Sequence, residues 1–138
     1  MKPIRVLIAE DSELFAEFLS SLVSGEPDME VIALAGDGER AVELCASLRP
    51  DIVLMDIQMP KMDGLAATQY IMSDTPTPIL VITSDPYQGG VDMSFKALSS
   101  GALDLIAKPE FHAWAEASQR EFLRKIRLLS QVAVVRHM

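Results

Sequence analysis

The sequence has one cysteine, two histidines and no long hydrophobic run, and each shortage excludes a class of protein. Cys45 cannot form a disulfide within the chain, and the apolar residues spaced around it indicate a small core side chain. No apolar stretch approaches the roughly 20 residues that a membrane-spanning helix needs. Glu10, Asp11 and Glu13 stand where a secretory signal would have its apolar middle. We therefore expect a cytoplasmic protein without a membrane partner.

The charge of the chain argues against nucleic acid as a direct partner, because the net value is −8 at pH 7. The charge is uneven, since five basic residues and one acid follow from Arg120 onward. Leu123, Ile126 and Leu129 recur there at helical spacing, which favours the solvated face of a docked helix over a nucleic-acid or membrane patch. A chain of 138 residues that is 49% hydrophobic is long enough for one well-buried domain.

Short apolar runs alternate with amphipathic stretches along the whole sequence, a pattern typical of a parallel sheet covered by helices on both faces. The runs predict five strands, over residues 4–9, 31–35, 52–55, 79–83 and 103–107. With right-handed crossovers the expected fold is α/β, a doubly wound, flavodoxin-like sheet in the order 2-1-3-4-5. In that order, the loops after strands 1 and 3 flank a common crevice.

Capping residues divide the intervening stretches into five helices. The first four are predicted to begin after Ser12, Asp37, Asp63 and either Gly90 or Asp92. They are predicted to end at Gly25, Pro50, Pro76 and Gly101, respectively. The fifth helix is expected to begin near Pro109 and to continue to about Val135.

Three carboxylates follow neighbouring strands: Glu10 and Asp11 after the first, and Asp56 after the third. Ionised together in a crevice they repel one another unless a cation intervenes. Oxygen donors alone fit Mg²⁺, Mn²⁺ or Ca²⁺ rather than zinc, because both histidines are expected in the C-terminal helix and the one cysteine lies on another element. Two or three carboxylates with open positions for water and a phosphate suit Mg²⁺ best. The sequence therefore predicts a Mg²⁺ site.

A metal-held carboxylate can act as a nucleophile toward phosphorus and form an aspartyl phosphate, and Asp56 is our candidate. Lys108, after the fifth strand, would neutralise a phosphoryl oxygen, and Thr83, after the fourth, would donate a hydrogen bond to another. Ser84 is a second candidate for that hydroxyl.

Five motifs occur in order at matching spacing: Glu10-Asp11, residues 56–60 with 62–64, Thr83-Ser84, Gly101-Ala102 and Lys108-Pro109. Over about residues 3 to 130, the chain resembles the receiver domain of two-component response regulators. The resemblance implies a sensor histidine kinase as partner. It also implies these roles: Asp56 as phospho-acceptor, Asp11 as direct metal ligand, Glu10 as water-mediated ligand, Gln58 as backbone ligand, Thr83 as switch hydroxyl and Lys108 as phosphate-sensing cation.

Two further features bear on that resemblance. The family's Lys-Pro bond is usually cis, so Lys108-Pro109 is expected to be cis as well. Receivers commonly carry an aromatic switch residue three positions before the lysine, and this chain has Leu105 there. The aromatic half of the usual switch is therefore in question.

A narrower resemblance links the chain to the receiver of chemotaxis protein-glutamate methylesterases. It rests on the Thr75-Pro76-Thr77-Pro78 stretch, the Gly89-Gly90 pair, residues 97–98 with 101–104, and residues 122–126. The chain contains no Gly-x-Ser-x-Gly elbow, so it would be only the regulatory part of such an enzyme. On this interpretation residues 1–130 form the receiver, and residues 131–138 begin a linker to an output domain.

Other functions remain open at this point. The chain could be a stand-alone single-domain receiver, or a pseudo-receiver that binds partners without phosphate. It could also be a phosphatase-type hydrolase with Asp56 as nucleophile. Such an enzyme would want a second acid two residues later, where Gln58 stands.

Overall fold

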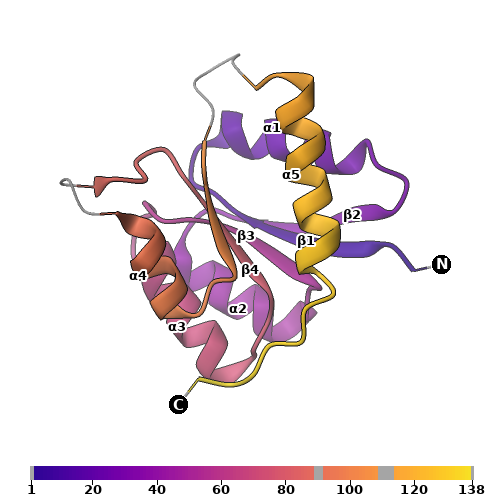
Figure 1. The fold of residues 1–138 in the computed structure, drawn as a ribbon. Helices are drawn as coiled ribbons and strands as arrows, with labels where there is room; N and C mark the ends of the chain where they lie inside the picture. The colour runs from indigo at the N-terminus through magenta and orange to yellow at the C-terminus, as the bar shows by residue number, and fades with distance from the viewer. Residues whose placement is uncertain (1, 89–91, 109–113, 138) are drawn as a thin grey trace.

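The computed structural model of the chain describes residues 2–88, 92–108 and 114–137 (Figure 1). In chain order its elements are β1 (Ile4–Ala9), α1 (Glu13–Ser24), β2 (Met29–Ala35), α2 (Gly38–Leu48), β3 (Ile52–Asp56), α3 (Gly64–Asp74), β4 (Ile79–Thr83), α4 (Met93–Ser100), β5 (Asp104–Ala107) and α5 (Glu116–Leu129). Within these ranges, none of the helices has the length and apolar character needed to cross a bilayer.

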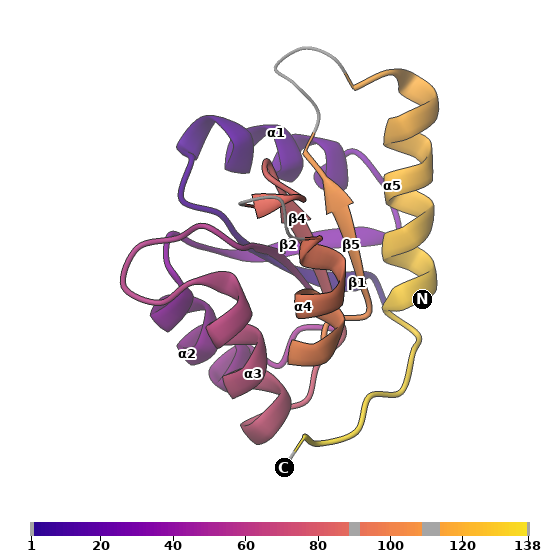
Figure 2. The same cartoon turned by 60° about the vertical axis from the view of Figure 1, so that its left-hand side comes forward.

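The strands form one parallel sheet in the order β2-β1-β3-β4-β5, which confirms the predicted α/β topology. Helices α1 and α5 cover one face, and α2, α3 and α4 cover the other (Figures 1 and 2). Successive strand residues point to opposite faces, so the sheet contributes to two apolar layers. Leu7, Val53 and Val81 pack toward α2, α3 and α4, while Ile8 and Leu54 pack toward α1 and α5. This burial on both sides explains why the central strands β3 and β4 are apolar up to their last residue.

Four of the helices begin at the capping residues that the sequence indicates. In each case a side-chain oxygen accepts a hydrogen bond from a backbone N–H of the first turn, which stabilises the helix terminus. The caps are Ser12, Asp37, Asp63 and Asp92, which accept from residues 15, 40, 66 and 94. The predicted ends hold as well, with Gly25 capping α1 and Gly101, at φ 115°, capping α4.

The predicted extent of the last helix is wrong at its C-terminal end. Helix α5 stops at Leu129 and is capped by Ser130, six residues before the expected end at Val135. The rest of the chain runs back beneath the sheet toward α3 (Figure 1). There Val134 packs against the core layer of α2, α3 and α4, and the N–H of His137 donates to Met72 O at 2.9 Å. His137 is therefore not in a helix, and of the apolar residues near the terminus Val134 packs on the core, whereas Val132 and Val135 are exposed.

The predicted start of that helix near Pro109 and the position of His112 lie outside the described residues. Trp114 precedes the helix rather than belonging to it, because α5 begins at Glu116. Cys45 is fully buried, as predicted, with its Sγ 3.3 Å from Thr77 Oγ1.

Arg127 ties α5 to the turn between α1 and β2. Its guanidinium donates to both carboxylate oxygens of Asp28, at 2.7 and 2.9 Å, and to Glu26 at 2.6 Å. These hydrogen bonds favour the ionised form of Asp28 and hold the pKa of its carboxyl below the ordinary value of 3.8.

Arg127→Met is expected to lower the free energy of unfolding by about 1 kcal/mol at neutral pH, the upper end for an exposed ion pair. Because the pKa of Asp28 is lower in the folded state, its contribution is present above 3.8 and is lost as the pH falls further. In urea titrations, the difference from the wild type should therefore shrink below about pH 4. Arg120→Met is the control, because the side chain of Arg120 is 72% exposed and its ion pair with Glu116 is long, at 3.8 Å. A difference independent of pH would contradict this account.

Candidate functional site

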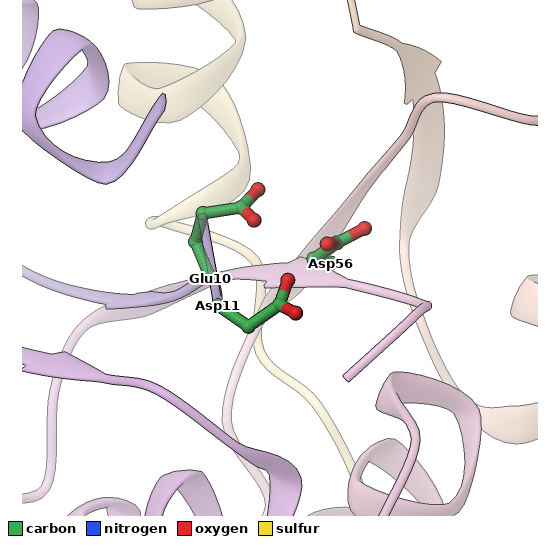
Figure 3. A group of neighbouring side chains, drawn as sticks. All are labelled: Glu10, Asp11 and Asp56. Atoms are coloured by element: carbon green, nitrogen blue, oxygen red, sulfur yellow. The ribbon is translucent and has the colours of Figure 1, made fainter. Parts of the chain in front are cut away.

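Three carboxylates meet at the carboxyl edge of the sheet (Figure 3). Ala9 pairs with Met55, so the residues that follow on the two strands, Glu10 and Asp56, lie side by side. Glu10, Asp11 and Asp56 each offer an oxygen, and these oxygens lie within 4.8 Å of one another. Only Asp11 is exposed, whereas Glu10 and Asp56 are each 5% exposed. The predicted gathering of the three acids is confirmed, and three hard oxygen donors at this spacing fit a divalent cation.

Lys108, directly after β5, places its ammonium between two of these acids. Its Nζ lies 2.5 Å from Glu10 Oε1 and 3.1 Å from Asp56 Oδ2, and the side chain is 13% exposed. Burial raises the pKa of Glu10, an effect that its hydrogen bonds from Lys108 and the Ser12 N–H only partly offset. Burial alone would lower the pKa of Lys108, but the contacts with Glu10 and Asp56 together raise it. The lysine is therefore held as a cation against the carboxylates.

The exposed Asp11 borders a hollow beside the cluster, which the loop between β3 and α3 also lines. Gln58, Met59 and Pro60 of this loop line it, together with Lys96 of α4. Among the described residues Asp11 takes part in no ion pair, while Glu10 is engaged with Lys108 and the Ser12 N–H. Of the three acids of the cluster, Asp11 is the one that lines this hollow.

Thr83 ends β4 beside this cluster and is 1% exposed. Asp56 pairs with Ile82, the residue before Thr83, and the N–H of Lys108 donates to Thr83 O at 2.7 Å. The Thr83 hydroxyl accepts from the N–H of Asp85 at 3.1 Å. Ser84, the second candidate, is exposed.

Gly64 fixes the backbone behind Asp56. Its N–H donates to Ile57 O at 2.7 Å, and a Cβ at this position would lie 1.8 Å from the backbone oxygen of Asp56. A glycine is required because α3 starts in direct contact with the end of β3. The preceding Asp63 caps α3, so these two residues of the Met62-Asp63-Gly64 motif set the path of the chain that carries the phospho-acceptor candidate.

Sequence reasoning missed one neighbour of the site. The Lys108 ammonium lies over the ring of Phe15, 4.8 Å from its centroid. Phe15 belongs to the first turn of α1, whose cap Ser12 follows the acidic pair, so its place beside the carboxylates could have been inferred from that spacing. Leu105 is half-buried and packs against the core layer of α2, α3 and α4. The expected cis bond at Lys108-Pro109 lies outside the described residues.

Comparison with known proteins identifies the family. Residues 6–115 match the response regulator receiver domain. The chain belongs to the response regulator receiver family. It is thus a signalling domain, as its motifs suggested. Its acidic cluster at the ends of β1 and β3 corresponds to the acidic pocket at which receiver domains generally bind Mg²⁺.

Relatives and solved structures place the chain further within the family. It is 47% identical to protein-glutamate methylesterase/protein-glutamine glutaminase 2 of Anaeromyxobacter dehalogenans over 137 residues, 99% of this chain and 39% of that protein. The response regulator domain of Thermotoga maritima CheB is 36% identical, with a TM-score of 0.83 over 96% of this chain and 99% of that one. CheY in a CheX-CheY-BeF3-Mg²⁺ complex from Borrelia burgdorferi is a third match, 28% identical with a TM-score of 0.78, covering 92% and 89%.

The curated relatives are much longer than this chain, which spans about two fifths of their length. The shared part is the receiver, homologous to the regulatory domain of these methylesterases.

Proposed function

We propose that Asp56 of this receiver accepts a phosphoryl group from a sensor histidine kinase and that Thr83 and Lys108 bind the transferred group. The observation that carries this proposal is the position of the Lys108 ammonium. It lies 3.1 Å from Asp56 Oδ2, inside a cluster that also contains Glu10 and Asp11. A nucleophilic carboxylate beside a fixed cation is the arrangement that phosphoryl transfer needs.

In the transfer step, a carboxylate oxygen of Asp56 attacks the phosphorus atom of the donor. The new O–P bond forms as the bond from phosphorus to the leaving group breaks, and the leaving group takes the bonding electron pair. That group is the imidazole of a phosphohistidine or the acetate of acetyl phosphate. Lys108 supplies positive charge to the phosphoryl oxygens, and the Thr83 hydroxyl donates a hydrogen bond to one of them.

Mg²⁺ is the cofactor we propose, held by Asp11 and Asp56 directly, by Glu10 through water and by the backbone carbonyl of Gln58. The donor set supports this assignment, because it contains oxygen alone and one acid, Asp11, is open to the hollow. When bound, the ion supplies positive charge that balances the carboxylates and the phosphoryl oxygens.

The output we propose is a protein-glutamate methylesterase domain that follows residues 131–138 in the parent protein. Support comes from the relatives, which carry that activity in their names and are longer than this chain. The proposed setting is the cytoplasm, where a histidine kinase would act. A hydrolase that uses Asp56 is a weaker candidate, because Gln58 stands where such an enzyme wants its second acid.

The test is incubation with acetyl phosphate in the presence of Mg²⁺ or of EDTA, followed by intact-mass measurement. We expect one added phosphoryl group with Mg²⁺ and none with EDTA. Incorporation that does not need the metal would contradict the proposed site, and continuous turnover of the donor without a covalent adduct would support the hydrolase.

Asp11→Asn is expected to weaken Mg²⁺ binding more than Glu10→Gln does, by about tenfold or more. The reason is that Asp11 is exposed toward the hollow, whereas both oxygens of Glu10 already accept hydrogen bonds. A calorimetric Mg²⁺ titration of both variants measures the difference, with Asp74→Asn, on the exposed end of α3, as control. Equal losses in the two variants would refute the assignment of direct and water-mediated ligands.

A further inference from the structure

The Lys108 ammonium contacts two carboxylates of the site and also an aromatic ring outside it. Glu10 and Asp56 contact its ammonium at 2.5 and 3.1 Å, and the centroid of the Phe15 ring lies 4.8 Å from it. A cation over the face of a ring is attracted by the negative charge density of that face, and the attraction grows when the pair is shielded from water. Lys108 is 13% exposed, so the ring contributes to where the ammonium rests.

Phe15 is the first ring of a continuous row. Its centroid lies 5.9 Å from that of Phe18 in a stacked pair, and Phe18 lies 5.8 Å from Trp114 in a tilted one. Trp114 in turn lies 4.9 Å from Phe122, which is buried inside α5. All three distances are within the range of favourable ring pairs. The row therefore connects the lysine of the site, through α1, to the start of α5.

The row of rings would respond to phosphorylation of Asp56, which is the proposed function on which this inference rests. Phosphorylation moves the negative charge of Asp56 outward by the length of the new phosphoryl group and increases it. The ammonium then follows a phosphoryl oxygen, and its position over Phe15 changes. Because the rings are in direct contact, a change at Phe15 alters the packing of Phe18 and Trp114.

We propose that Phe15 is a positioning residue for Lys108, and that the rings of Phe15, Phe18 and Trp114 couple the position of this ammonium to the start of α5. This route runs through α1 and does not use the position of Leu105. This chain has Leu105 where receivers commonly have an aromatic switch residue. The row of rings would be a separate group of side chains whose packing follows the position of Lys108.

A mutant cycle tests the coupling without any phosphodonor. Trp114 is the single tryptophan of the chain, so its fluorescence reports on one end of the row. Lys108→Met removes the charge but keeps an apolar stem, and we expect it to change the emission and the acrylamide quenching of Trp114. In a Phe15→Leu background, Lys108→Met should change the emission and the quenching of Trp114 by no more than about a third of the change in the wild-type background. Equal changes in the two backgrounds would overturn the proposal.

Two matched variants separate positioning from general disturbance of α1. Phe15→Tyr keeps the ring and should preserve the wild-type cycle. Leu14→Ala alters the neighbouring residue, which is 58% exposed, and should also leave the cycle unchanged. Far-UV circular dichroism checks that each variant is folded.

A second arm uses the phosphodonor and does not depend on the folding of Lys108→Met. With acetyl phosphate and Mg²⁺, the wild type should show a Trp114 signal that appears together with the phosphoryl adduct. Phe15→Leu should form the adduct about three- to fivefold more slowly, because the ammonium is less confined, and should lose most of the Trp114 signal. An adduct with the full signal in Phe15→Leu would overturn the coupling. A wild type that forms no adduct would refute the proposed function instead, and the mutant cycle would still decide this inference.

Discussion

Asp56→Asn is expected to abolish phosphoryl incorporation from acetyl phosphate, with a rate at least about a thousandfold below that of the wild type. An amide is a very poor nucleophile toward phosphorus, and the other carboxylates of the cluster do not take its place. Both carboxylate oxygens of Glu10 already accept hydrogen bonds, and among the described residues Asp11 forms no ion pair with Lys108, the cation proposed to bind the transferred group. Intact-mass spectra over a time course measure the loss.

The variant should remain folded, because the asparagine oxygen can still accept from Lys108 and the crowding of three negative charges is relieved. Asp74→Asn is the matched control, since it makes the same chemical change on the exposed end of α3 and should label like the wild type. Persistent labelling of Asp56→Asn at the wild-type rate would mean that another residue is the acceptor.

Gly64→Ala is expected to cost about 2–4 kcal/mol of folding free energy and to displace Asp56. The added Cβ would lie 1.8 Å from the backbone oxygen of Asp56, and neither atom can move without shifting β3 or the start of α3. Urea unfolding gives the stability change, and the rate of phosphoryl incorporation reports on Asp56. Both should fall together.

Gly36→Ala is the control for Gly64→Ala, because a Cβ at Gly36 meets no atom within 4 Å. Its effect on stability should stay within about 0.5 kcal/mol. If the two glycine variants were equally stable, the close approach of α3 to the end of β3 would not determine the position of Asp56.

The strands and helix starts could be predicted because their signals are local. A buried parallel strand has to be apolar on both faces, and a side-chain acceptor stabilises the start of a helix, so residues 79–83 and caps such as Asp63 stand out in the sequence. The topology then brings the strand ends together, which is why the meeting of Glu10, Asp11 and Asp56 could be foreseen.

The missed features depend on contacts between distant parts of the chain. Residues 132–135 are apolar, and as a local pattern they extend the helix. Val134 instead packs on the opposite core layer and the N–H of His137 binds Met72 O, so tertiary burial ended α5 at Leu129. Such long-range packing outweighs the modest differences in helix propensity between residues.

Within the site, residue types were predictable and their pairings were not. The sequence identified Lys108 as a cation for the phosphoryl group, but it did not reveal the ion pair with the buried Glu10 or the ring of Phe15 against the ammonium. The ion pair depends on how far β5 extends relative to β1, which no local pattern encodes, whereas the place of Phe15 beside the carboxylates could have been inferred from its spacing after Ser12. The roles assigned to Thr83 and Gln58 stay predictions.

Locating the phosphoryl group is the measurement that tests the central claim most directly. After reaction with acetyl phosphate and Mg²⁺, borohydride reduction converts an aspartyl phosphate into homoserine, which peptide mass spectrometry locates in the sequence. The account predicts homoserine at position 56, in the peptide that contains Gln58 and Lys61, and an unmodified Asp11. Homoserine at Asp11 or at another acid, with Asp56 unchanged, would contradict it.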